Sequence, residues 1–113
     1  MDSILTSVKK MLGIGEEYNH FDPDIIMHIN STFFTLFELG VGPSTPFRIE
    51  DDTAKWSDFI EDGFADAVKS YMALKVRLLF DPPQSSGVIE LMKQQIAEYE
   101  WRLNVRVDPV TTF

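Results

Sequence analysis

Asp24 and His28 are the residues of this chain whose types and spacing come nearest to a metal site. They stand four positions apart, so that a helix would place a carboxylate and an imidazole on one face, where the two could share a cation. The chain has only two histidines and no cysteine, and no third ligand falls in register with the pair. We therefore interpret Asp24 and His28 as part of a solvated polar stripe, and we predict no metal and no other cofactor.

A second group that could do chemistry is a run of six acids between residues 50 and 62. A calcium-binding loop needs its acids in the order Asp-x-Asp-x-Asp-Gly, and the run does not have that order. We interpret it as an acidic face formed by Glu50, Asp51, Asp52, Asp58, Glu61 and Asp62.

Catalytic motifs are missing from the sequence. It contains no nucleophile elbow, no phosphate-binding glycine loop and no pair of carboxylates with an adjacent base. The lack of cysteine also excludes thiol chemistry and suits a protein assembled inside a cell. We expect this protein not to be an enzyme.

Composition and charge narrow the remaining classes. A chain of 113 residues with 44% apolar and 25% charged residues fits one globular domain that can bury a core. Its net charge of −8 disfavours tight binding to nucleic acid, which requires bases that neutralise phosphates. The first segment, SILTSVKKMLGI, lacks the continuous apolar run of a signal peptide or a membrane span, so we expect a soluble protein with no membrane association.

Apolar residues at helical spacing predict a mainly α fold, a small bundle of about four to five helices. Helices are expected over residues 2–12, 23–39, 64–80 and 86–103, with a short helix that Thr53 caps and that runs through Ile60. Gly13 and Gly40 are placed to end the first two, and Asp22 ahead of Pro23 is the expected N-cap of the second. The second helix is apolar around most of its circumference, so we expect it to be buried on most sides.

Two irregular segments separate these helices. Residues 40–53, GVGPSTPFRIEDDT, hold two glycines and two prolines and form the predicted long loop. The sequence Asp81-Pro82-Pro83 halts the fourth helix, because a residue before proline avoids the α conformation, and Ser85 or Ser86 caps the restart.

The last predicted helix leaves its largest side chain unexplained. Ile89, Met92, Ile96, Tyr99 and Leu103 recur at spacings of 3 and 4, which is typical of a seam against one neighbouring helix. Trp101 points roughly 160° away from that seam. Either another part of this chain covers Trp101, or a partner does.

We divide the chain into a helical domain, residues 1–103, and an extended C-terminal docking tail, residues 104–113. The tail carries apolar residues beyond the seam, and Asp108-Pro109 blocks a helix there. Such a segment either binds in an extended form to the surface of another protein or is disordered, as chain ends commonly are.

The residue pattern indicates an acidic helical interaction domain, and three segments of the chain also carry a resemblance to a known family. ILTSVKKMLGI, FDPDIIMHINSTFFTLFELGVGP and above all VKSYMALKVRLLFDPPQSSGVIELMKQQIAEYEWRLNV resemble the head-tail connector, or adaptor, proteins of long-tailed bacteriophages. The resemblance covers nearly the whole chain in order. It implies a structural virion protein in the neck, assembled in the host cytoplasm as a ring, usually twelve-fold, between the portal and the stopper or tail-completion protein.

The resemblance also implies roles for particular residues. It assigns portal binding to the end of the chain, at Trp101, Arg102, Val105, Arg106, Val107, Val110 and Phe113. Contacts between subunits or with the tail side are expected at Phe47, Arg48, Ile49, Tyr71, Leu74 and Leu78. Acids that line the ring would let DNA pass during packaging and ejection without being bound, and the six acids named above are the candidates.

A different class of protein also fits the composition. A small acidic phage-encoded regulator or inhibitor could bind one host protein as a monomer or dimer, and an acidic surface that only keeps a protein soluble needs no DNA channel.

Overall fold

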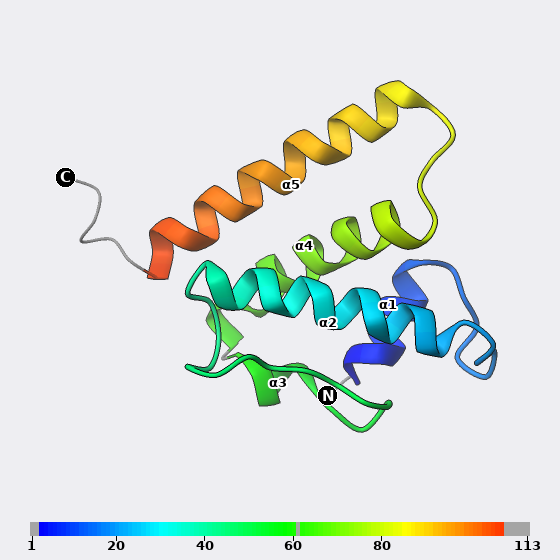
Figure 1. Cartoon of the computed structure of the whole chain (residues 1–113), viewed down its shortest axis with the longest axis horizontal. Coiled ribbons are helices and arrows are strands. Elements are labelled where there is room, and N and C mark those ends of the chain that lie inside the picture. Colours follow the sequence, from blue (N-terminus) through cyan, green and yellow to red (C-terminus); the bar gives the residue numbers. More distant parts are fainter. Residues whose placement is uncertain (1–2, 61, 108–113) are drawn as a thin grey trace.

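The computed structural model describes residues 3–60 and 62–107, except for the side chains at positions 62–64, 106 and 107. The fold is mainly α, as the sequence predicts, with five helices in this part of the chain (Figure 1). They are α1 (Ile4–Met11), α2 (Asp22–Glu38), α3 (Trp56–Phe59), α4 (Asp62–Phe80) and α5 (Ser86–Val107).

Helix α4 is the centre of the arrangement and contacts each of the other four helices. In Figure 1, α2 crosses in front of α4, α1 and α3 lie on the far side of α2 from α5, and α5 runs back along α4 as a separate arm. The molecule is flat, with extents of 47 × 35 × 19 Å. Helices α2 and α5 each keep a face turned away from the core, where Met27, Phe34, Leu91 and Trp101 are exposed.

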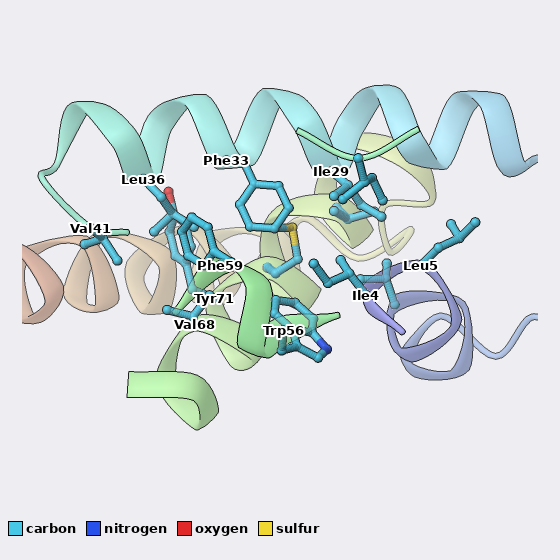
Figure 2. Packing of buried hydrophobic residues seen from close by; sticks show 14 of the residues in the cluster. Ile4, Leu5, Ile29, Phe33, Leu36, Val41, Trp56, Phe59, Val68 and Tyr71 are labelled. Atoms are coloured by element: carbon cyan, nitrogen blue, oxygen red, sulfur yellow. The ribbon is translucent and has the colours of Figure 1, made fainter. Parts of the chain in front are cut away.

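The core lies between α2, α4 and the two short helices. Figure 2 shows Ile29, Phe33 and Leu36 pointing from α2 towards Trp56, Phe59 and Tyr71. The Phe33 ring lies 4.6 Å from the Phe59 ring, and the Trp56 indole donates its buried N–H to Ser7 Oγ at 3.2 Å. Because the only polar atom of this tryptophan has a partner, its burial carries no unpaired donor.

Helix α1 lies within the predicted range of residues 2–12 but is shorter, and α2 begins with a different cap from the one predicted. Ser3 Oγ accepts the Thr6 N–H at 3.1 Å, and Gly13 follows the helix with a φ of 80°, which favours glycine. Phe21 rather than Asp22 occupies the N-cap position of α2. Asp22 lies in the first turn, and its Oδ1 is 2.9 Å from the Nζ of the buried Lys9.

The long loop of residues 40–53 is irregular, as predicted. Gly42 has a φ of 94°, and a Cβ there would lie 2.5 Å from the Phe59 ring, so that the loop approaches the core as only glycine allows. The Asn30 side chain holds the other end of the loop, since its Nδ2 donates to Ile49 O at 2.9 Å and its Oδ1 accepts the Ile49 N–H at 2.7 Å. Ile49 is buried as a result.

The short helix α3 is capped by a different residue from the one expected. Thr53 does not cap it, because its hydroxyl and N–H both donate to Asp51 Oδ1, at 2.6 and 2.9 Å. The cap position belongs to Lys55, whose backbone N–H donates to Asp58 Oδ2 at 2.8 Å.

The break between α4 and α5 falls at Asp81-Pro82-Pro83, as predicted, and Ser85 caps the restart by accepting the Val88 N–H at 3.3 Å. The seam is also confirmed, because Met92, Ile96 and Leu103 are buried. No helix in residues 3–60 or 62–107 is both long and apolar enough to cross a membrane.

The predicted extended conformation of residues 104–107 is wrong, because α5 continues through Val107. The seam ends at Leu103, but nothing from Asn104 to Val107 breaks a helix, and the next proline is Pro109. Asn104 also has a partner in the body of the fold, since its Nδ2 donates to Leu39 O at 3.1 Å.

Candidate interaction surfaces

The outer face of α5 holds the most exposed large apolar side chain in the described part of the chain. Trp101 has 67% of its surface exposed, so no loop or helix described in the structure covers it. Leu91 and Val88, at 60% and 43%, are exposed on the same helix. Of the two sequence-based alternatives, cover by another part of this chain is therefore not found among the described residues.

The other residues predicted to bind a portal lie around or beyond Trp101. Arg102 is exposed and its guanidinium Nη2 lies 2.6 Å from Glu98 Oε1. Val105 is half-buried and helical, so it does not show the alternating faces of an extended tail. The side chains of Arg106 and Val107, and the whole of Val110 and Phe113, lie outside the described part of the chain.

The residues predicted to contact other subunits or the tail side divide into two groups. Ile49 and Tyr71 are buried within the chain itself, which corrects their expected place at a surface. Phe47 is half-buried, and its ring lies 5.0 Å from that of Phe33 and 5.3 Å from that of Phe59. Arg48 is exposed, while Leu74 and Leu78 pack against the core at its edge.

Tyr71 is buried because it links α4 to α5. Its hydroxyl donates to Glu100 Oε2 at 2.7 Å, and Lys75 Nζ lies 3.9 Å from the same oxygen. Burial, reinforced by the hydrogen bond and charge of Glu100, raises the pKa of the Tyr71 hydroxyl well above its ordinary value. The phenol therefore stays protonated and keeps donating.

The acidic candidates are exposed where the structure describes their side chains. Glu50, Asp51, Asp52 and Asp58 all face solvent, in and just after the long loop. Hydrogen bonds from the Thr53 hydroxyl and N–H lower the pKa of Asp51. The carboxylate of Asp58 accepts the backbone N–H of Lys55 at the start of α3. Glu61 lies outside the described residues, as does the side chain of Asp62.

Asp24 and His28 lie on the wall of an open hollow of about 610 Å³ at the start of α2. Phe21 and Phe80 line the same hollow, and the Phe80 ring lies 6.4 Å from the His28 ring. Within residues 3–60 and 62–107, no three His, Cys, Asp or Glu side chains gather in a way that could hold a metal ion.

Sequence reasoning missed a stripe on the outer face of α2. Asp24, Met27, Ser31, Phe34 and Glu38 follow one another at spacings of 3 and 4, and Met27 and Phe34 are 58% and 51% exposed. The many apolar residues of α2 predict a helix that is buried on most sides. The signal lay in the spacing, which sets this stripe opposite Ile25, Ile29 and Leu36.

Comparison with known proteins identifies a family for this chain. The family model described as phage connector protein matches residues 4–110, nearly the whole chain. No curated protein and no solved structure matches it.

Proposed function

The chain belongs to the phage connector protein family, and from that premise we propose that it is a structural, non-enzymatic adaptor that forms a ring between the portal and the tail. The observation that carries the proposal is the family match, which spans the described helices and the segment after them. The exposed apolar faces of α2 and α5 support it, because a chain that acted alone would have little reason to expose Met27, Phe34, Leu91 and Trp101.

Portal binding is proposed for the C-terminal end of α5 and the residues after it. Trp101 supplies a large apolar anchor, and the stretch from Trp101 to Val107 contains two arginines and no acid in a chain of net charge −8. Aromatic side chains and arginine are the types that contribute most at protein interfaces. The end of α5 therefore differs in chemistry from the rest of the acidic surface.

The ring would surround the DNA as it enters and leaves the head. Exposed carboxylates such as Glu50, Asp51 and Asp52 repel phosphates, whereas lysines in a lumen would bind the backbone and slow passage. On this proposal the long loop faces the channel or the tail side, and the protein acts in the neck of the virion.

Negative-stain imaging of the full-length chain, alone and mixed with the portal of its phage, tests the proposal. We expect rings, or crowns on one end of each portal. A chain that stays monomeric or dimeric alone and leaves the portal bare would contradict the adaptor and favour the acidic regulator of a host protein.

Pull-down on immobilised portal tests the place of the contact. A chain that ends at Val107 keeps all five helices, so any loss of binding comes from residues 108–113 and not from a shortened α5. We expect this chain to keep its helical signal and to bind the portal at least tenfold more weakly than the full-length chain. Undiminished binding would exclude residues 108–113 from the contact and place it on the part of the chain that remains, at the end of α5 or on the 40–53 loop.

A further inference from the structure

The outer stripe of α2 is a ridge that combines apolar and acidic side chains. Met27 and Phe34 form its centre, the exposed Ser31 lies between them, and the exposed acids Asp24 and Glu38 stand at its two ends. From Asp24 to Glu38 the ridge is about 21 Å long. We call this set of five residues the α2 ridge.

A groove lies on the other side of the fold, where α1, α4 and α5 meet. It has a volume of about 390 Å³ and is lined by Met11, Lys69, Ser70, Ala73, Leu74 and Tyr99. Ser70 points roughly 160° away from the core residue Met72, so the groove lies on the face of α4 that is turned away from the core. The short side chains of Ser70 and Ala73 leave room for a helix to approach α4 closely.

The ridge and the groove are complementary in charge. Both charged residues of the ridge are acids, whereas the one charged residue that lines the groove is Lys69, whose Nζ lies 5.9 Å from the centre of the Trp56 ring. Arg102 and Glu98 border the groove at its end, where they pair with each other. A groove whose one charged lining residue is a lysine suits an apolar helix that carries acids.

One chain cannot bring its own ridge to its own groove. The ridge points away from the core on α2, while the groove opens on the opposite side of α4, and α2 and α4 are packed against each other. Two copies can pair these surfaces, but only with unlike faces in contact. Such a heterologous contact repeats from copy to copy and closes into a ring when the rotation allows it.

We propose that the α2 ridge of one copy occupies the α4–α5 groove of the next, and that this contact joins neighbouring subunits. The inference rests on the proposed ring and deepens it by naming the two surfaces that meet. It leaves the end of α5, with Trp101, free to bind the portal.

Cysteine crosslinking tests the pairing directly, because the natural chain contains no cysteine. Ser31→Cys marks the ridge and Ser70→Cys marks the groove, and both serines are exposed, so neither substitution disturbs the core. Ser44→Cys, on the exposed long loop, is the matched control. A bismaleimide that spans about 10 Å, one helix diameter, tolerates small errors in register.

The crosslinking is run on full-length chains under the conditions in which imaging shows rings, alone or on portals. We expect the two single variants to crosslink when mixed, at more than ten times the yield of either one alone or of any mixture with Ser44→Cys. The double variant should give a ladder of covalent multimers.

The outcomes separate this inference from the proposed function. Rings that form without a crosslink between Ser31→Cys and Ser70→Cys overturn the pairing and leave the adaptor standing. Efficient dimers from Ser31→Cys alone also overturn it, because they show that like faces meet. A complete lack of rings, both alone and with portal, overturns the adaptor and the pairing together.

Discussion

Trp56 and Trp101, the two tryptophans of the chain, have opposite surroundings. Trp56 is 1% exposed, lies at the centre of the core and donates a hydrogen bond to Ser7. Trp101 is 67% exposed, on a helix whose main contact is with α4. The same side chain therefore has two different surroundings, since Trp56 contributes to the stability of the core and Trp101 is, on our proposal, available to a partner.

The largest expected effect follows from removing the buried tryptophan. Trp56→Ala should lower the free energy of unfolding by about 3–5 kcal/mol, because it leaves a cavity and an unpaired Ser7 hydroxyl. Urea denaturation followed by circular dichroism measures this loss. Trp101→Ala should change the free energy of unfolding by less than about 0.5 kcal/mol. Equal losses for the two variants would show that both tryptophans stabilise the core.

The second prediction concerns what Trp101 does instead. Trp101→Ala should weaken binding to the portal by about 2 kcal/mol, roughly 30-fold in Kd, because an interface tryptophan is commonly a dominant contact. Titration of labelled chain with portal measures the change. Lys93→Ala, another exposed residue of α5, is the control and should leave the affinity within about twofold.

A smaller effect is expected where α5 joins the body. Tyr71→Phe removes the hydroxyl that donates to Glu100 and should lower the free energy of unfolding by about 1.5 kcal/mol, the usual size for a hydrogen bond to a charged group. Thermal denaturation followed by circular dichroism measures it. No loss at all would mean that the seam alone holds α5 on α4.

The same contact predicts a dependence on pH. The pKa of Tyr71 is raised in the folded chain above its ordinary 10.0, so the folded state holds this proton more tightly than the unfolded state does. The contribution is complete below pH 10 and is lost as the pH rises from there towards the folded pKa. Stability above pH 10 should therefore fall more steeply in the natural chain than in Tyr71→Phe, and parallel profiles would contradict this.

The smallest effect belongs to the ion pair on the outer face of α5. Glu98→Gln breaks the pair with Arg102, but both side chains are more than half exposed, so the free energy of unfolding should fall by no more than about 0.5 kcal/mol. Chemical denaturation at low and high salt measures it. A loss as large as that of Tyr71→Phe would show that surface charge contributes to the docking of α5.

The sequence predicts the body of the fold better than its surfaces. The glycines and prolines at the ends of the helices are local signals, and the seam of α5 follows from spacing alone, so these features could be predicted. The burial of Ile49 could not, because it depends on Asn30, nineteen positions away, which pairs with its backbone. Tyr71 was likewise assigned to a surface because its partner Glu100 lies in another helix.

The outward-facing side chains of α2 were not predictable either, although here the sequence suggested burial and the structure shows exposure. A count of apolar residues on α2 predicted burial, yet Met27 and Phe34 face away from the helices that cover Ile25 and Ile29. Which stripe of an apolar helix meets the core depends on the positions of its neighbours, and a single sequence does not contain those positions. Trp101 was the exception, since the seam of its own helix fixed its direction.

The mass of the complex between full-length chain and portal tests the central claim most directly. An adaptor ring predicts that many copies bind each portal cooperatively, with few partly filled intermediates, and that Trp101→Ala abolishes this saturation at concentrations where the natural chain completes it. A portal whose mass does not change at saturating chain, or one that binds single copies independently of one another, would contradict the account.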